Sequence, residues 1–278
     1  MGRMDEEVMS RELDMAWQHV FTWASWAIVL VMLVIAIQLG RAHRTPFYVW
    51  AIFAAGLGAF AEPLYDVAFD LWFYDVHNGE PGAMYSHFSA FGVVQPNWSH
   101  SGYVILYAAV ALYAGKKMYD GALSRKTLFL IWGAEIMTSV VFEVIGTGTD
   151  VYTYYGPYEL RIWNYPAVIG VLEGTQTVLF TVLAVQIWRR VSTPWGLSAL
   201  IAAFPITMFG ANFGIGAPII IALHLDPGDF NTGIVWFATF LTMGLCALAI
   251  NGAARFLPKP FGTPEPDGAQ VPRETVAV

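Results

Sequence analysis

Long apolar runs separated by short polar segments are the feature that most limits what this chain can fold into. A helix that crosses a bilayer needs about 20 consecutive, mostly apolar residues. Seven segments reach this length, at residues 19–40, 47–72, 98–118, 126–149, 166–188, 196–222 and 231–255. Only 13% of the 278 residues are charged, whereas a soluble domain carries about 25%. The sequence therefore predicts an all-α, polytopic membrane protein with seven transmembrane helices.

The ends of the chain differ from this apolar middle. The first apolar run, Val20–Leu39, is interpreted as a true span, because it is longer than the apolar core of a signal peptide and follows acidic residues. We expect an N-terminal segment (1–18), a seven-helix domain (19–257) and a disordered tail (258–278) rich in Pro, Gly and charge. The single cysteine, Cys246, excludes an intrachain disulfide.

The basic residues are distributed unevenly between the two sides of the predicted membrane. Three of the 14, Arg3, Arg11 and Arg161, fall on one side. The others fall on the opposite side, at Arg41, Arg44, Lys116, Lys117, Arg125, Lys126, Arg189, Arg190, Arg255, Lys259 and Arg273. Basic loops stay in the cytoplasm, so we expect a multi-pass protein of the cell membrane with its N-terminus outside and its C-terminus inside. The net charge of −7 does not indicate nucleic-acid binding.

Carboxylates within or at the ends of the spans are the first indication of a site. They are Glu62, Asp66, Asp70, Glu135, Glu143, Asp150 and Glu173. Each costs about 2.5–3.5 kcal/mol at a helix centre, so such residues are functional candidates. The span directions place all but Glu135 in the outer half of the membrane, and we predict that they converge on one outward-side cavity. An interfacial position is the alternative for Asp70 and Asp150, and a bond to a neighbouring helix for Glu135.

These acids have no cationic partner at membrane depth, because no lysine or arginine lies within the middle of a span. Three explanations stay open: the acids are protonated, they bind a cation, or they accept hydrogen bonds in a hydrated pocket. Loss of water favours the neutral form of a carboxyl group. A neutral carboxylic acid in an apolar site is a ready proton donor.

Aromatic residues accompany the acids along the sequence. They are Tyr65, Trp72, Trp98, Tyr103, Trp132, Tyr152, Tyr154, Tyr155, Trp163 and Tyr165. An interfacial belt of Trp and Tyr explains some of them. The alternative is a cavity lined with aromatic faces, which stabilises a carbocation through cation–π attraction. A neutral acid and aromatic walls are together what the protonation of an isoprenoid double bond or epoxide requires.

The stretch Val141–Pro166 concentrates these groups as E-x-x-G-x-x-x-D-x-Y-x-Y-x-G…P. The motif residues are Glu143, Gly146, Asp150, Tyr152, Tyr154, Gly156 and Pro166. This pattern resembles the signature of the membrane-bound carotenoid hydratases, except at Thr147–Thr149, where that family tends to carry an apolar Pro-Phe-Gly run. The seven-span layout and Glu62, in AEPLYD, are similar to the heterodimer-type lycopene cyclases and to the integral-membrane fungal meroterpenoid cyclases.

The resemblance implies a cyclase or hydratase that needs no metal or other cofactor and acts on an apolar isoprenoid or terpenoid. We expect Glu62, Glu143 and Glu173 to be the acid set, with Asp66 and Asp150 orienting them or holding water. The expected substrate-binding residues line a cavity or complete its hydrogen bonds. They are Trp132, Tyr152, Tyr154, Trp163, Trp98, Asn97, His100 and Tyr65.

Other functions compete with this interpretation. A proton-coupled transporter or lipid-binding protein also uses buried acids, and a line of carboxylates across the whole membrane would favour it. A closed pocket in the outer half favours the enzyme. A magnesium-dependent prenyltransferase would use Glu62, Asp66 and Asp70, but only Arg161 is on the correct side to bind a diphosphate. The seventh span has no lysine for retinal, and the six histidines form no diiron motif.

Two further segments leave alternatives open. The sixth predicted span contains Pro205 and the run GANFGIGAP around Asn212. Its small residues indicate either close helix packing or a broken helix beside a cavity. The long segment 75–96 contains no lysine or arginine and is either a lid over the outer mouth or a solvated loop.

Overall fold

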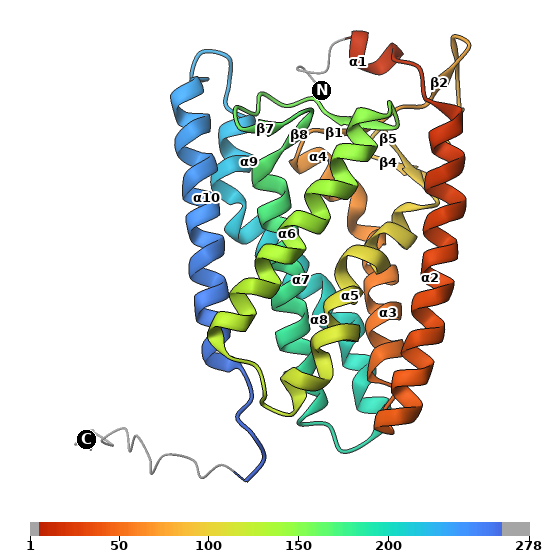
Figure 1. Cartoon of the computed structure of the whole chain (residues 1–278). Helices are drawn as coiled ribbons and strands as arrows, with labels where there is room; N and C mark the ends of the chain where they lie inside the picture. The colour runs from red at the N-terminus through yellow and green to blue at the C-terminus, as the bar shows by residue number, and fades with distance from the viewer. Residues whose placement is uncertain (1–5, 263–278) are drawn as a thin grey trace, which may run out of the picture.

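Helices form most of the computed structural model, which describes residues 6–262 (Figure 1). The α-helices are α1 (Glu6–Ser10), α2 (Met15–His43), α3 (Phe47–Gly58), α4 (Glu62–Ala68), α5 (Ser99–Tyr119), α6 (Arg125–Gly148), α7 (Ala167–Trp188), α8 (Leu200–Met208), α9 (Ala217–Leu223) and α10 (Thr232–Ala253). Shorter turns of 3₁₀ or π-helix are η1 (Ala59–Ala61), η2 (Pro194–Ala199), η3 (Phe209–Ile215) and η4 (Ala254–Phe256).

Six helical segments are long and apolar enough to cross a membrane. They are Met15–His43, Phe47–Ala68, Arg125–Gly148, Ala167–Trp188, Pro194–Ile215 and Thr232–Phe256. Helix α5 has 21 residues and packs against α3 and α7 in the same bundle, but its polar ends make it less apolar than these six. The membrane character predicted from the sequence is therefore supported by six helices, and the seventh span stays a prediction.

Helix α7 lies at the centre of the bundle and contacts α5, α6, α8 and α10 (Figure 1). Of its most apolar stretch, 83% is buried, against 28% for α2 at the edge. Large apolar side chains of α2, such as Trp23 and Leu30, are exposed instead. Because a surface of this kind is favourable in lipid and unfavourable in water, the outer helices are suited to contact with a bilayer.

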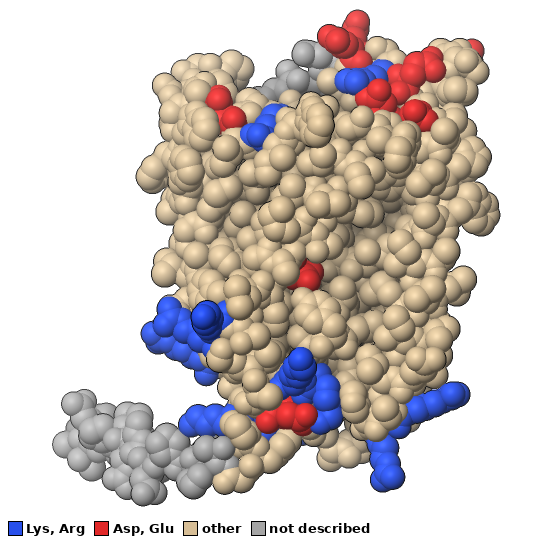
Figure 2. All heavy atoms as spheres, in the orientation of Figure 1, with Lys and Arg blue, Asp and Glu red and all other residues tan. Residues whose placement is uncertain are grey.

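Charged side chains gather at the two ends of the bundle, and the broad band between them shows only a small acidic patch on this face (Figure 2). The basic end contains the last residues of α2, α5 and α7 and the first residues of α6, including Arg41, Lys117, Arg190 and Arg125. The opposite end contains the N-terminal acids and all the strands (Figure 1). This separation is the three-dimensional form of the asymmetry in the sequence.

The sixth predicted span is a broken helix. Pro205 lies inside α8, and the following turn, η3, is a π-helix, a form that often marks functional sites. Asn212 is fully buried in this turn. A side chain at Gly216 would lie 2.0 Å from the carbonyl oxygen of Asn212, so the glycine permits the close return of the chain into α9. The small residues therefore serve the break in the helix.

Short strands close one end of the bundle. They are β1 (Leu71–Phe73), β2 (Val76–His77), β3 (Glu80–Pro81), β4 (Ser86–Ala90), β5 (Val93–Pro96), β6 (Tyr152–Tyr154), β7 (Arg161–Ile162) and β8 (Tyr165–Pro166). They form four antiparallel pairs: β1–β6, β2–β3, β4–β5 and β7–β8. The segment 75–96 therefore contains two hairpins.

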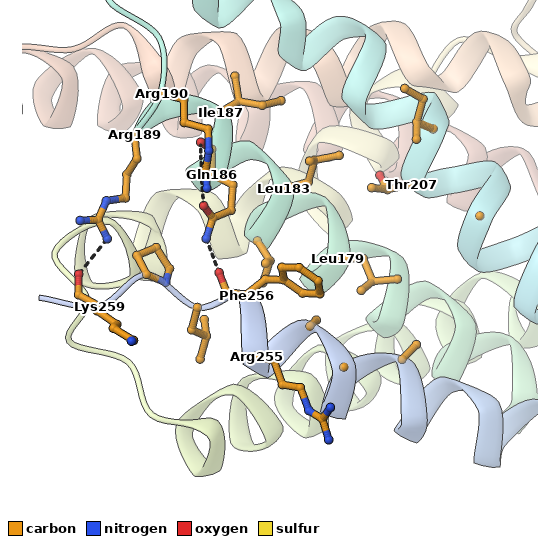
Figure 3. A pocket seen from close by; sticks show the side chains of 18 of the residues that line it. Leu179, Leu183, Gln186, Ile187, Arg189, Arg190, Thr207, Arg255, Phe256 and Lys259 are labelled. Atoms are coloured by element: carbon orange, nitrogen blue, oxygen red, sulfur yellow. Dashed lines mark hydrogen bonds between the residues drawn. The ribbon is translucent and has the colours of Figure 1, made fainter. Parts of the chain in front are cut away.

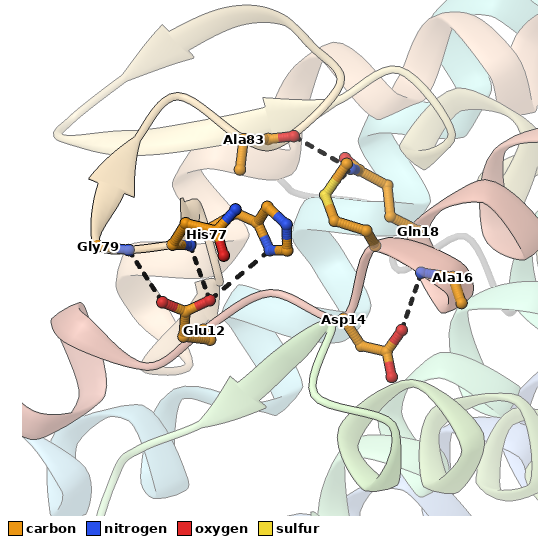
Figure 4. A network of polar contacts seen from close by, with 9 residues as sticks. Glu12, Asp14, Ala16, Gln18, His77, Gly79 and Ala83 are labelled. Atoms are coloured by element: carbon orange, nitrogen blue, oxygen red, sulfur yellow. Dashed lines mark hydrogen bonds and ion pairs between the residues drawn. The ribbon is translucent and has the colours of Figure 1, made fainter.

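The N-terminal segment is fastened to these hairpins (Figure 4). The Glu12 carboxylate accepts hydrogen bonds from the backbone N–H groups of Asn78 and Gly79, both at 2.9 Å. The Gln18 side chain donates to the carbonyl oxygen of Ala83 at 3.0 Å. Asp14 caps α2 by accepting from the N–H of Ala16 at 2.9 Å. Helix α2 and the hairpins are therefore held together at this end.

The predicted disordered tail begins at Pro258, and its first part has a defined path. The Arg189 guanidinium donates to the carbonyl oxygen of Lys259 at 2.9 Å and lies 4.2 Å from the ring centre of Phe261. These contacts fasten 258–262 to the end of α7. The remainder of the tail, 263–278, lies outside the described residues.

Candidate active site

Three carboxyl groups from three helices line one small cavity beneath the strands. Glu62 is the first residue of α4, Glu143 lies near the end of α6, and Glu173 lies in the first half of α7. The cavity has a volume of about 40 Å³, more than the roughly 10–15 Å³ that one ordered water requires. The three acids of the expected acid set therefore meet around a space that can hold water.

A change of helix type places Glu62 in this pocket. Helix α3 ends at Gly58, and the 3₁₀ turn η1 leads into α4. Pro63 occupies the first turn of α4, where its missing N–H and fixed backbone angle are tolerated. The tighter 3₁₀ turn alters the helical phase, so Glu62 is presented to the bundle interior at the junction.

A glycine gives the pocket one of its aromatic walls. Gly146 lies one turn after Glu143 on α6, and a Cβ atom there would be 2.2 Å from the ring of Tyr152. The Tyr152 ring occupies the space that a side chain would take. This contact gives a physical reason for the E-x-x-G pattern. The residue one helical turn after Glu143 must be small, because the Tyr152 ring packs against it.

Glu173 accepts hydrogen bonds from three hydroxyl groups. One oxygen, Oε1, accepts from the Tyr65 hydroxyl at 3.3 Å. The other, Oε2, accepts from the Tyr165 hydroxyl at 3.1 Å and from Ser139. The Ser139 and Tyr165 oxygens are themselves 3.1 Å apart. This network fixes the orientation of the carboxyl group from α4, α6 and β8.

Glu143 and Glu62 also have tyrosine partners, and the Tyr152 hydroxyl is a second partner of Glu143. The Tyr154 hydroxyl donates to Oε2 of Glu143 at 3.2 Å, and the Tyr103 hydroxyl donates to Oε2 of Glu62. Burial raises the pKa of Tyr154 well above its usual value, as it does for Tyr165. Both phenols therefore keep their protons and act as donors.

No positive side chain lines this pocket among the described residues. Arg161 lies near the pocket, in the segment between α6 and α7 that also contains Tyr154. Its guanidinium donates to the backbone carbonyl oxygens of Tyr154 at 3.0 Å, Gly156 at 2.7 Å and Asn164 at 2.7 Å. Arg161 therefore holds the loop that carries Tyr154 and does not neutralise an acid. Three buried carboxyl groups in electrostatic contact cannot all be charged at little cost.

The β1–β6 pair forms the roof of the pocket. Leu71 pairs with Tyr154, and Phe73 pairs with Tyr152. Side chains alternate between the two faces of a strand. These four residues of β1 and β6 line the pocket, whereas the residues between them, Trp72 and Thr153, do not. The roof therefore joins two segments about 80 residues apart in the sequence.

Aromatic rings complete the walls. Trp98 lies against Phe73 and Tyr152, with ring centres 5.6 and 5.9 Å apart. Phe142 of α6 is the only residue of the pocket lining that is not buried, among the residues that the structure describes. Its ring contacts that of Phe21 on α2 at 5.5 Å. Phe142 is therefore the point at which the pocket lining is partly exposed.

The structure brings together seven of the residues expected from the sequence: Glu62, Glu143, Glu173, Tyr65, Trp98, Tyr152 and Tyr154. It places the expected aspartates outside the pocket. Asp66 is fully buried one turn after Glu62 and accepts a hydrogen bond from Gln95 at 2.6 Å. Asp150 is half-exposed and forms an ion pair with Arg11 at 2.6 Å, the interfacial alternative.

The remaining expected residues also lie outside the pocket. The Trp132 indole N–H donates to the Thr175 hydroxyl at 3.0 Å, and Trp163 is 84% exposed. His100 contacts the Gly56 carbonyl oxygen at 2.7 Å and the His87 ring at 2.8 Å. Asn97 is half-buried at the end of β5. The expectation that these side chains wall a cavity has no counterpart in this pocket.

Several residues that line the pocket or support it were not among the expected site residues. Tyr103, named above only as an aromatic neighbour of the acids, lies four residues before Tyr107 on one face of α5, with Ser99 one turn earlier. This helical spacing of hydroxyl groups was a sequence signal that one face of α5 lines a polar site. Phe73, Phe142 and Gln95 carried no such signal, because their roles depend on which segments pair.

The acids Glu62, Asp66 and Asp70 do not form a metal-binding group. Asp66 is bonded to Gln95, and Asp70 faces His224 at 3.4 Å. Within 6–262, no three His, Cys, Asp or Glu side chains are arranged to hold a metal ion. The helical spacing that suggested a magnesium site is thus divided among separate partners.

The candidate site of this chain is therefore described by its pocket and its membrane helices alone. Comparisons with protein-family models, with curated proteins and with solved structures gave no match.

Proposed function

We propose that this chain is an integral-membrane cyclase or hydratase that protonates an isoprenoid alkene or epoxide and directs the resulting carbocation. The proposal rests on three carboxyl groups that line one pocket beneath aromatic side chains. They accept hydrogen bonds from hydroxyl groups, and no lysine or arginine lines the pocket among the described residues. The pocket is lined by buried residues except at Phe142 and lies near the strand-bearing end, which favours an enzyme over a carboxylate line across the membrane.

The chemistry follows from these groups. A neutral carboxylic acid gives its proton to one carbon of the double bond, and the other carbon becomes a tertiary cation. The rings of Tyr152 and Trp98 stabilise this cation. In hydration, water adds to the cation and its proton returns to a carboxylate. In cyclisation, an internal alkene adds instead, and a second carboxylate removes a proton from the product cation.

Substrate access requires side chains to move, because the cavity has a volume of only about 40 Å³ and all its lining residues except Phe142 are buried. Phe142 is the half-buried ring in the wall, and Gly102 of α5 lies beside it, 3.9 Å from the ring at the position of a Cβ atom. The isoprenoid end group enters here from the bilayer interior. The remaining apolar chain of the substrate stays in lipid, between α5 and α6.

In the proposed orientation, the strand-bearing end lies outside the cell membrane and the basic end lies in the cytoplasm. The support is the separation of charge along the bundle (Figure 2) together with the rule that basic loops stay inside. The acid pocket then exchanges protons with the outer aqueous side.

The experiment compares lipid extracts of cells that express the chain with linear and epoxidised isoprenoid precursors, by mass spectrometry, with and without EDTA. We expect a product isomeric with its precursor, or heavier by one water, that is insensitive to EDTA. Glu143→Gln should lower its formation at least about 100-fold, because general acid catalysis contributes that much. An equally active Glu143→Gln enzyme would contradict the role of this residue.

Glu135→Gln is the matched control. Glu135 lies on the same helix and is also buried, but it accepts a hydrogen bond from Tyr113 at 2.8 Å, away from the pocket. We expect this variant to keep its activity. Equal losses in both variants would indicate general damage to α6. A product that requires magnesium would move the assignment to a prenyltransferase.

A proton-coupled transporter is the second candidate, favoured by polar groups that continue inward from Glu173. The Asn212 amide donates to Gln176 at 2.5 Å at the broken helix. Four further buried atoms, on Gln176, Asn212, Thr181 and Thr242, have no hydrogen-bond partner among the described residues. Unwound helices with polar linings form transport sites. Proton uptake into vesicles that Glu173→Gln abolishes, without any new lipid product, would establish this function.

A further inference from the structure

A second cavity lies at the basic end of the bundle, between α7, the broken helix and the end of α10 (Figure 3). Its volume is about 1440 Å³, far larger than that of the acid pocket. It is an open groove, because lining residues such as Ile206 and Phe256 are 66% and 68% exposed. No residue lines both cavities, so the two sites are separate.

The groove is apolar along its length and cationic at one end. Leu179, Leu183 and Gly210 line the part inside the membrane helices. Four cations lie at the other end: Arg189, Arg190, Arg255 and Lys259. No acidic residue lines the groove within the described part of the chain. Figure 3 shows the same separation, with the labelled cations toward one end and Leu179 and Thr207 toward the other.

Contacts between the chain segments fix this cationic end. The Gln186 amide donates to the carbonyl oxygen of Phe256 and so joins α7 to η4. The Gln186 carbonyl oxygen accepts from Arg190, which also donates to the backbone oxygen of Gln186 at 2.9 Å. The Arg255 guanidinium forms no hydrogen bond or ion pair with any described residue. Positive charge is therefore held at the groove and is not neutralised there.

The level of the cations matches the boundary of the membrane helices. Two spans, Ala167–Trp188 and Thr232–Phe256, end beside them, while Leu179 and Leu183 lie deeper. A ligand that fits both parts has a negative headgroup at the boundary and apolar chains in the bilayer. We propose that this groove binds an anionic phospholipid of the adjacent leaflet, with its negative headgroup at the cationic end of the groove. Basic pockets between membrane helices recognise such headgroups.

The test measures lipid retention by the purified full-length chain. Detergent-solubilised protein is incubated with phosphatidylglycerol or with phosphatidylcholine, and the lipid that stays bound is counted by native mass spectrometry. We expect preferential retention of phosphatidylglycerol. The double variant Arg190→Gln/Arg255→Gln should weaken its binding roughly 25-fold, because each positive charge near the headgroup contributes about fivefold. The matched charge control is Arg41→Gln, an exposed residue at the same end of the bundle but outside the groove.

A second variant tests the apolar part. Gly252 lines the groove, and a Cβ atom there meets nothing within 4 Å, so Gly252→Leu adds an apolar side chain that occupies part of the groove. We expect it to weaken lipid retention. Gly244→Leu is the control, because Gly244 lies on the same helix with equally open surroundings but does not line the groove.

Three results would overturn the proposal. One is equal retention of phosphatidylglycerol and phosphatidylcholine, the behaviour of ordinary boundary lipid. Another is unchanged retention in both groove variants. The third is full displacement of the lipid by millimolar inorganic phosphate, which would show that the site binds a free anion and that the apolar groove contributes nothing.

Discussion

The acids of the pocket differ in the number of hydrogen bonds that their side chains accept. Glu173 accepts hydrogen bonds from Tyr65, Tyr165 and Ser139, whereas Glu143 has only the hydroxyl groups of Tyr154 and Tyr152 as partners in the described chain. Hydrogen bonds from hydroxyl groups stabilise the charged form of a carboxyl group. In the proposed reaction, we therefore expect Glu143 to donate the proton and Glu173 to accept it.

Gly146 provides a test at the scale of one residue. In Gly146→Ala, the new Cβ atom meets the Tyr152 ring at 2.2 Å, so the tyrosine must leave its place in the wall. Overpacking of this kind costs about 1–3 kcal/mol, and we expect a lower melting temperature in detergent together with a loss of product.

The control for this prediction is Gly133→Ala on the same helix. A Cβ atom there meets nothing within 4 Å, and alanine favours a helix over glycine by about 1 kcal/mol. We expect this variant to be as stable as the parent chain or more stable. A Gly146→Ala protein that melts and reacts like the parent would show that Tyr152 is not held by this contact.

At the scale of elements, the strands and the N-terminal segment form one cover over the pocket. The β1–β6 pair supplies the roof, and Arg161 fixes the loop behind it. The N-terminal segment lies across the next hairpin, where the N–H of Leu13 donates to the carbonyl oxygen of Val76 at 2.7 Å. The β1–β6 pairing and the contact between Leu13 and Val76 join segments that are distant in the sequence.

Acid should loosen this cover through Glu12. The backbone N–H groups of Asn78 and Gly79 lower the pKa of Glu12 below its ordinary value of 4.5. Since the folded pKa is depressed, the stabilising contribution is present above pH 4.5 and is lost as the pH falls through the lowered value. We expect the amide protection of Asn78 and Gly79, corrected for intrinsic exchange, to fall over that range.

Glu12→Gln should lower the same protection already at neutral pH, because a neutral amide accepts these two hydrogen bonds more weakly than a carboxylate. Glu80→Gln serves as the control, because Glu80 is exposed on β3 of the same hairpin. If Glu12→Gln leaves both amides as protected as Glu80→Gln does, the N-terminal segment is held by its backbone contacts alone.

At the scale of the whole molecule, the charge separation predicts the orientation in the membrane. The native Cys246 is fully buried, so the parent chain provides an unlabelled background for a cysteine-accessibility experiment. We expect a membrane-impermeant maleimide to label Glu80→Cys on intact cells, and Lys117→Cys only after lysis. The reverse pattern would invert the orientation and place the acid pocket near the cytoplasm.

The part of this protein that follows from the sequence is the part that depends on local pattern. Apolar length and scarce charge identified the membrane helices, and basic loops gave a direction. Depth within those spans was sufficient to select Glu62, Glu143 and Glu173, because a carboxyl group at membrane depth must be enclosed by protein. These three acids do share one pocket.

The partners of those acids were decided by the tertiary structure. Trp163 and Tyr154 occur in one aromatic loop, but Trp163 is exposed whereas Tyr154 is buried against Glu143. Tyr154 lies on β6, which pairs with β1 over the pocket, whereas Trp163 lies in the turn between β7 and β8. Asp150 forms an ion pair with Arg11 and does not join the acids of the pocket. Local sequence reports the burial tendency of a residue, whereas its neighbour depends on how distant segments pack.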